Sequence, residues 1–155
     1  PLYKGTDVLT QTPISLAIRQ TSPDSNKKWV SEDKYLENFA AMNGRPSLTG
    51  TYLYPQLEIW KGLSQKDRES SYNRYAHVNF TFDRNAEKNI KPIPSSPIAD
   101  QFNLTIEPCD RFLKYNNVGF LITSAEFEEG AANCASLLRT VNYPQMDYFI
   151  YKLNF

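Results

Sequence analysis

Five short segments near the end of the chain alternate between strand-like and helix-like hydrophobic patterns, and this alternation constrains the fold more than any other feature. Residues 102–106, 118–123 and 148–153 have the length and apolar pattern of strands, whereas residues 110–115 and 131–141 repeat apolar side chains at helical spacing. This order is typical of an α/β layer, because right-handed crossovers place successive strands side by side. The sequence therefore predicts an α/β domain with a mixed sheet and a βαβαβ C-terminal half.

The N-terminal half is expected to be an irregular mixture of helix and strand. Residues 12–20 begin with threonine and proline before an apolar stripe, which predicts a capped helix. A short strand is predicted over residues 28–30, and a second helix is predicted from a cap at Asp33 to a glycine at position 44. No internal repeat divides the chain, so we expect one soluble domain over residues 1–155.

The middle of the chain contains two long connections. Residues 45–62 are rich in turn formers and aromatic side chains, and we expect a long loop with one helical turn near Glu58. Residues 65–75 predict a polar helix that leads into a half-buried strand over residues 77–82. The proline-rich stretch over residues 84–100 predicts an exposed connection.

The charge and the composition exclude some classes of partner. The chain has 17 basic and 17 acidic residues scattered along its length, with a sequence pI near 7.1. A nonspecific nucleic-acid binder needs a basic face, so we expect no nucleic-acid partner. The chain is 41% hydrophobic, which is enough for a core, but its apolar runs are far shorter than the roughly 20 residues of a membrane span.

The start of the sequence and its two cysteines suggest how the domain is used. The chain begins with Pro1 and shows no export signal, which we interpret as a fragment cut from a larger protein. Cys109 and Cys134 can form one disulfide, or they can remain two buried thiols, because a domain of this size does not need a cross-link. The sequence leaves both alternatives open.

Residues 72–77, YNRYAH, contain the only histidine of the chain. An imidazole can act as acid or base near neutral pH, so His77 is the candidate for catalysis if a carboxylate or nucleophile lies beside it. The sequence has no nucleophile elbow, phosphate-binding glycine loop or HExxH pair, and one histidine with two cysteines is too few for a structural zinc site. We therefore expect no metal, no cofactor and no catalysis in this domain, with His77 as the alternative.

Two non-catalytic roles fit the same stretch and the aromatic loop before it. One role is structural, with Asn73 and Arg74 hydrogen-bonding backbone groups where a helix meets a strand. The other is glycan contact, because aromatic faces cover sugar rings while arginine and asparagine side chains hydrogen-bond sugar hydroxyls. The candidate ligand residues are Tyr52, Tyr54, Trp60, Tyr72, Asn73, Arg74 and Tyr75. The same rings can instead form a small aromatic core beneath the loop.

Several strings, taken together, resemble a known class of protein. They are Thr12-Pro13-Ile14 with Asp24 and Trp29, then Tyr54-Pro55-x-Leu57-Glu58-x-Trp60, then YNRYAH, then Cys109 before Val118-Gly119-Phe120, and finally residues 148–153. They resemble the soluble C-terminal domain of large polytopic bacterial membrane proteins that are uncharacterised or glycosyltransferase-like, of the multi-spanning kind that uses polyprenyl-phosphate sugars. The resemblance covers the chain from about Thr12 onward.

The resemblance implies a domain on the extracytoplasmic face of a bacterial cell membrane, within a polytopic protein of cell-surface polysaccharide or glycolipid assembly. Catalysis in such transferases is expected to rely on acidic residues in loops between membrane helices, so this domain would be accessory. Its expected partners are the membrane portion of the same chain and a glycan or lipid-linked sugar. The alternatives are a glycan-active enzyme that uses His77, and a structural module that docks on the membrane portion.

Overall fold

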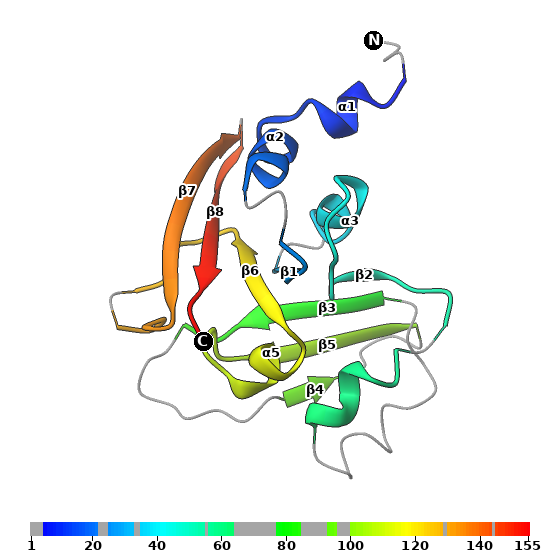
Figure 1. Cartoon of the computed structure of the whole chain (residues 1–155), viewed down its shortest axis with the longest axis vertical. Coiled ribbons are helices and arrows are strands. Elements are labelled where there is room, and N and C mark those ends of the chain that lie inside the picture. The colour runs from blue at the N-terminus through cyan, green and yellow to red at the C-terminus, as the bar shows by residue number, and fades with distance from the viewer. Residues whose placement is uncertain are drawn as a thin grey trace.

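The computed structural model describes residues 5–21, 25–32, 35–54, 56–63, 77–84, 93–95, 100–128, 130–143 and 145–155 (Figure 1). The helices are α1 (Asp7–Thr10), α2 (Pro13–Gln20), α3 (Phe39–Met42), the 3₁₀ helix η1 (Ile59–Gly62) and α5 (Arg111–Tyr115). The strands are β1 (Lys28–Ser31), β2 (Gly50–Thr51), β3 (His77–Phe82), β4 (Ile93–Ser95), β5 (Gln101–Ile106), β6 (Val118–Thr123), β7 (Ala135–Tyr143) and β8 (Met146–Leu153).

The first sheet has the strand order β1-β6-β8-β7 and combines both kinds of strand pairing. β1 lies parallel to β6, whereas β8 is antiparallel to both β6 and β7. Every residue of β6 is buried, because this strand is central and the sheet is covered on both faces. On β7, which ends the sheet, only Val141 is fully buried.

The second sheet has the strand order β2-β3-β5-β4. β3 and β5 run parallel, and β2 and β4 add antiparallel pairs on either side of them. Buried and more exposed positions alternate along β3 and β5, as expected for strands with one face toward the interior. The inward side chains are Val78, Phe80, Phe82, Phe102, Leu104 and Ile106.

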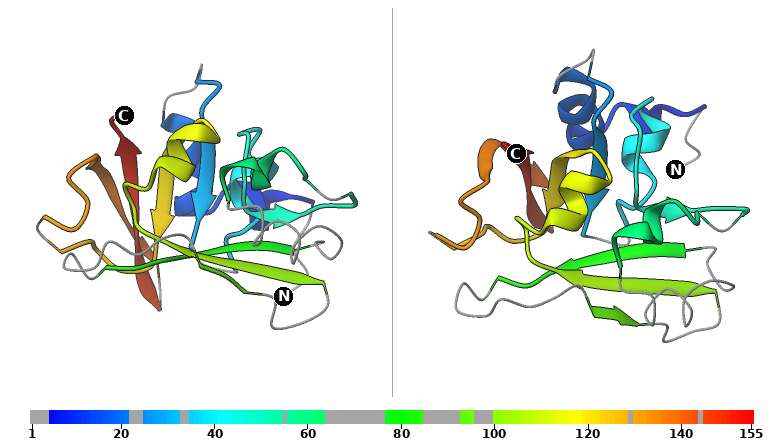
Figure 2. Two further views of the ribbon diagram at one scale, coloured as in Figure 1. Left: turned by 90° about the horizontal axis from the view of Figure 1, so that it is seen from below. Right: turned by 60° about the horizontal axis from the view of Figure 1, so that its bottom comes forward.

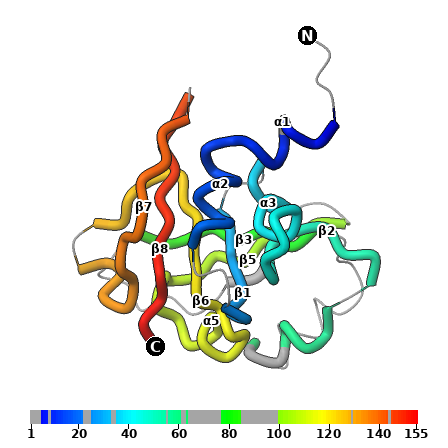
Figure 3. The backbone as a smooth tube through the Cα atoms, turned by 45° about the horizontal axis from the view of Figure 1, so that its top comes forward, coloured from blue at the N-terminus to red at the C-terminus, as the bar shows by residue number. Residues whose placement is uncertain are grey.

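Two hydrophobic clusters fill the interior, one on each face of the first sheet. The larger lies between the two sheets and includes Trp60 of η1 and Phe112 of α5. The smaller lies between the first sheet and helices α2 and α3, and in it Trp29 stacks on Phe120 with ring centroids 4.6 Å apart. The strands of the second sheet run across those of the first (Figure 2), and α2 and α3 lie on the opposite side of the first sheet (Figures 1 and 3).

Side-chain caps explain where two of the helices begin. Oγ1 of Thr12 accepts a hydrogen bond from the backbone N–H of Ser15 at 3.2 Å, and Pro13 occupies the first helical position of α2. A carboxylate oxygen of Asp110 accepts from the N–H of Phe112 at 2.7 Å at the start of α5. Both caps satisfy backbone donors that the helix itself leaves unpaired.

Two cross-links join elements of different sheets. Arg84, just after β3, donates to both carboxylate oxygens of Glu32, just after β1, with Nη1 2.8 Å from Oε1. The same oxygen of Glu32 accepts the backbone N–H of Phe82 at 3.0 Å. A disulfide joins Cys109, which follows β5, to Cys134, which precedes β7. The structure therefore adopts the first of the two alternatives that the cysteines allowed.

The predicted fold class, one α/β domain with a mixed sheet, is confirmed, but the order of its last elements differs. Residues 131–141, expected as a helix, lead into strand β7, so the C-terminal half has one helix among its strands rather than the predicted two. Leu137, Leu138 and Val141 match a helical period, yet the first two are each 42% exposed and form no buried helical face. Pairing with β8 along nearly the whole of β7 decides the conformation.

Several predicted helices and strands can be compared with the observed elements. The strands over residues 77–82 and 118–123 have the expected bounds, and η1 lies next to the helical turn expected near Glu58. The helix expected from Asp33 is shorter, because α3 begins only at Phe39. The polar helix over residues 65–75 and most of the connection over residues 84–100 lie outside the described residues.

Candidate functional site

His77 is the first residue of β3 and lies in a polar group that we call the His77 cluster: Glu37, Asn38, Thr51, His77 and Asp100. Antiparallel pairing of β2 with β3 places Thr51 directly opposite His77. The turn before α3 brings Glu37 and Asn38 to the same edge. The carbonyl oxygen of Asp100, just before β5, accepts a hydrogen bond from the backbone N–H of His77 at 2.9 Å. The turn before α3, strand β2 and the residue before β5 thus meet at the start of β3.

The imidazole of His77 has polar neighbours on both of its nitrogens. Nδ1 lies 3.1 Å from Oγ1 of Thr51, which is a hydrogen bond, and 3.6 Å from Oε1 of Glu37. Nε2 lies 3.9 Å from Oδ2 of Asp100. The His77 side chain is 33% exposed, so the cluster is partly open to solvent. A protonated imidazole would therefore be attracted by carboxylates on two sides.

Gly50 allows the turn that carries Glu37 to approach β2. Its φ is +140°, and a Cβ at this position would lie 2.9 Å from Oδ1 of Asn38. That oxygen accepts the backbone N–H of Thr51 at 3.4 Å, and the amide nitrogen of Asn38 donates to Oε1 of Glu37 at 3.2 Å. Glycine is thus required both by its backbone conformation and by the close packing of Asn38.

The side chains follow the order of a nucleophile–base–acid triad, but the distances from the carboxylates to the imidazole are longer than in such a triad. Thr51, His77 and Asp100 follow one another as hydroxyl, imidazole and carboxylate, which is the order of groups in an acyl-transfer triad. The carboxylates of Glu37 and Asp100 lie 3.6 and 3.9 Å from the ring, beyond the about 3.2 Å of a good hydrogen bond. Neither carboxylate holds the ring in place, so the cluster fits a hydrogen-bonding surface better than an oriented catalytic base.

Two of the aromatic candidates for glycan contact belong to the scaffold. The ring of Trp60 is 1% exposed and packs edge-on against Phe102, with ring centroids 4.1 Å apart, so it cannot lie against a surface ligand. Tyr52 is half-buried, and its hydroxyl donates to the carbonyl oxygen of Ser47 at 2.9 Å. Burial raises the pKa of Tyr52 to about 12. These two rings form the aromatic core that was the alternative interpretation of the loop.

Tyr54 is the described candidate whose ring faces solvent. Leu53, Tyr54 and Leu57, which we call the Tyr54 loop, are 93%, 77% and 45% exposed. The loop continues directly from Thr51, so it borders the His77 cluster along the chain. An exposed aromatic ring thus lies close in sequence to a group of partly exposed hydrogen-bonding side chains.

The remaining candidates for glycan contact belong to YNRYAH. Tyr72, Asn73, Arg74 and Tyr75 lie outside the described residues, as does the rest of YNRYAH before His77. Their roles in glycan contact or in supporting the helix-to-strand junction therefore stay predictions.

In the described part of the chain, no three or more His, Cys, Asp or Glu side chains gather closely enough to hold a metal ion. Within the same residues, no helix has the length and apolar character needed to cross a membrane.

Sequence reasoning identified His77 but not its neighbours. Glu37, Thr51 and Asp100 are separated from it by many residues. They meet because β2 and β5 flank β3 and because the turn before α3 packs against β2. β2 has two residues and lies within the stretch expected to be loop, so no periodic signal marked it. The one hint in the sequence was Gly50 before Thr51, because a glycine within a strand often marks a place where another segment approaches closely.

Comparison with known proteins places the chain in a family. The family model described as "Domain of unknown function (DUF7654)" matches residues 8–155. The chain belongs to this family. No curated protein and no solved structure matches it. The description of DUF7654 names no activity.

Proposed function

We propose that the chain is a non-catalytic accessory domain on the extracytoplasmic face of a bacterial cell membrane. In this proposal it belongs to a polytopic membrane protein that assembles cell-surface polysaccharide or glycolipid. It contacts glycan, or a lipid-linked sugar, through the Tyr54 loop and the His77 cluster. The observation that carries the proposal is the disulfide between Cys109 and Cys134.

The disulfide bears on the compartment because thiols are kept reduced in the cytosol and are oxidised outside it. This bond closes a loop with a sequence separation of 25 and joins segments that belong to different sheets. A cross-link at such a position contributes to the stability of the whole domain. An oxidising compartment is therefore the environment in which this fold is most stable, which supports an extracytoplasmic position.

The glycan contact is supported by the chemistry of the exposed edge. Sugar rings present C–H faces that pack on aromatic rings, and Tyr54 offers its ring to solvent. Sugar hydroxyls both donate and accept hydrogen bonds, and the His77 cluster supplies groups of each kind: carboxylates, an amide, a hydroxyl and an imidazole.

Cysteine labelling in intact cells tests the proposed location. Leu53 is 93% exposed, so Leu53→Cys in the full-length protein presents a reactive thiol, whereas Cys109 and Cys134 are unreactive in their disulfide. We expect a membrane-impermeant maleimide to label the variant in intact cells more strongly than the parent protein, because Leu53→Cys adds an exposed thiol. Labelling that requires permeabilised cells would place the domain in the cytoplasm and contradict the proposal.

A second candidate function is a glycan-active enzyme in which His77 acts as acid or base. The hydrogen bond between Thr51 and His77 and the two nearby carboxylates favour it. The assay measures whether the purified chain releases reducing sugar ends from a surface polysaccharide. Release that is abolished in His77→Gln and reduced in Asp100→Asn would establish this enzyme. The accessory proposal predicts no release of reducing ends by the parent chain or by either variant.

A further inference from the structure

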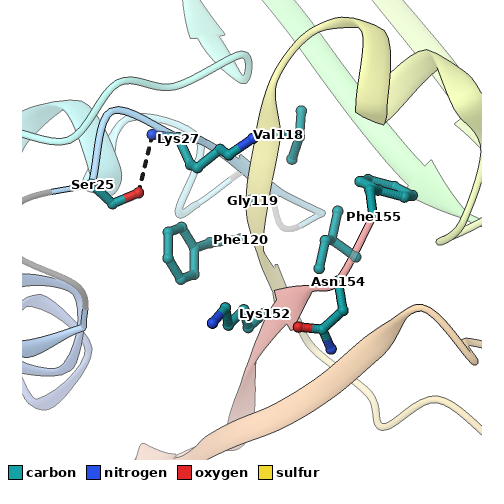
Figure 4. A pocket seen from close by; sticks show the side chains of 9 residues that line it. Ser25, Lys27, Val118, Gly119, Phe120, Lys152, Asn154 and Phe155 are labelled. Carbon is teal, nitrogen blue, oxygen red and sulfur yellow. Dashed lines mark hydrogen bonds between the residues drawn. The ribbon is translucent and has the colours of Figure 1, made fainter.

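A solvent-open hollow of ≈ 530 Å³ lies at the end of the first sheet where β6 begins and β8 ends (Figure 4). Its lining includes Lys27, Gly119, Phe120, Lys152 and Asn154, together with Ser25. The volume falls within the about 300–1,000 Å³ of ordinary ligand pockets. Because the hollow is open, it suits one unit of an extended chain better than a small molecule that must be enclosed.

Gly119 and Lys27 shape one wall of the hollow. A Cβ at Gly119 would lie 2.5 Å from Cβ and 2.8 Å from Cγ of Lys27, so the aliphatic part of Lys27 lies directly on the glycine backbone. Nζ of Lys27 donates to Oδ1 of Asn117 at 2.6 Å, and the carbonyl oxygen of Asn117 accepts the N–H of Lys28 at 2.9 Å. The ammonium group of Lys27 is therefore held beside β6 rather than free to turn away.

The charge at the hollow differs from that of the chain as a whole. The chain carries equal numbers of acidic and basic residues, 17 of each. The hollow is lined by two lysines and by no acidic side chain. Among the described residues neither Lys27 nor Lys152 forms an ion pair. Two ammonium groups that have no side-chain carboxylate beside them among the described residues create a local positive potential, which favours an anionic ligand.

We infer that this hollow binds the acidic group, a carboxylate or a phosphate, of a sugar unit in a glycan. The two ammonium groups attract the anion, and Ser25 and Asn154 provide hydrogen-bonding groups for sugar hydroxyls. Phe120 also borders the hollow, but its ring is 2% exposed and stacked on Trp29, so it closes the hollow without offering a face to the ligand. This inference rests on the proposed glycan contact and adds to it a second site and the class of glycan, an acidic one.

The test is an amide-NMR titration of the 155-residue chain with matched ligands. The ligands are a short oligosaccharide of glucuronic acid, a phosphorylated oligosaccharide, an uncharged oligosaccharide of equal length, and inorganic phosphate alone. We expect an acidic oligosaccharide to shift the amides of residues 25–27, 118–120 and 152–154, more weakly at higher salt. The carboxylate and phosphate ligands, compared at equal charge, show which acidic group the hollow prefers.

Charge variants identify the residues responsible. Lys27→Gln and Lys152→Gln each remove one charge from the hollow while keeping most of the aliphatic side chain. We expect each to weaken binding of the acidic oligosaccharide about tenfold, the equivalent of one charge-assisted hydrogen bond. Arg111→Gln is the matched control, because Arg111 is exposed on α5 and does not line the hollow. Unchanged amide spectra of the free variants show that the fold is intact.

Failure of this inference and failure of the proposed function give different results. If Lys27→Gln and Lys152→Gln bind oligosaccharides as well as the parent chain does, the inference about the hollow is wrong. The proposed glycan contact at the Tyr54 loop and the His77 cluster would not be contradicted by that result. Equal affinity for inorganic phosphate and for the acidic oligosaccharides would also overturn the inference about the hollow, because the sugar would then contribute nothing. No binding of any oligosaccharide would contradict the inference and the glycan contact together.

Discussion

Removing the disulfide between Cys109 and Cys134 should cost the domain a calculable part of its stability. The bond closes a loop with a sequence separation of 25, and in the chain-entropy model the restriction of such a loop in the unfolded state is worth about 3.5 kcal/mol at 25 °C. A domain of this size loses roughly 2–4 °C of melting temperature for each kcal/mol. We therefore expect the Cys109→Ala, Cys134→Ala double variant to melt about 7–14 °C lower than the parent chain.

Urea unfolding followed by tryptophan fluorescence measures this loss. Trp29 lies in the cluster beneath α2 and α3, and Trp60 lies in the cluster between the sheets, so the signal reports on both faces of the first sheet. The parent chain in reducing buffer should unfold at the same urea concentration as the double variant, and the reductant should not affect the double variant. A loss below about 1 kcal/mol, or a parent chain insensitive to reductant, would refute the reasoning.

Three further predictions follow from individual contacts. Arg84→Met leaves the largely buried carboxylate of Glu32 with the backbone N–H of Phe82 but without its cationic partner, and it should lower the free energy of unfolding by about 2 kcal/mol. An unchanged urea midpoint would show that the ion pair contributes nothing. The pKa of Tyr52 is raised to about 12 in the folded state, so the unfolded state loses its proton first and stability should fall as the pH rises from about 10 toward 12. Tyr52→Phe should flatten this fall in urea titrations at several alkaline pH values, and an equally steep fall would contradict the assignment. Gly50→Ala places a methyl group against Asn38 in an unfavourable backbone conformation and should cost about 1–3 kcal/mol in urea unfolding, whereas a neutral result would mean that the turn moves freely.

The parts of the fold that depend on local pattern could be predicted from the sequence. β3 and β6 were correctly bounded because their apolar side chains follow a strand pattern. α2 was correctly placed because Thr12 and Pro13 mark its first turn. These signals are carried by neighbouring residues and do not depend on tertiary contacts.

The parts that depend on distant partners could not be predicted. β7 has apolar residues at helical spacing, and only its pairing with β8 makes it a strand. The two-residue strand β2 is defined entirely by its pairing with β3. The neighbours of His77 and the two lysines of the hollow are brought together by the order of strands in the sheets, which no single stretch of sequence specifies.

The exposure of the Tyr54 loop likewise could not be read from the residue types. Tyr52, Tyr54 and Trp60 are chemically similar, and all three fit either a ligand surface or a core. The structure separates them: Trp60 is buried among the inter-sheet residues, Tyr52 is half-buried, and Tyr54 is exposed.

The most direct test of the proposed function is an amide-NMR titration of the 155-residue chain with fragments of bacterial surface glycans, comparing Tyr54→Ala with Tyr115→Ala. Tyr115 is 59% exposed on α5 and serves as a control ring outside the Tyr54 loop. The proposal predicts saturable shifts clustered at residues 51–57 and at His77. It also predicts that Tyr54→Ala weakens binding about three- to tenfold, whereas Tyr115→Ala does not. No saturable shift at millimolar glycan, or equal binding by both variants, would contradict it.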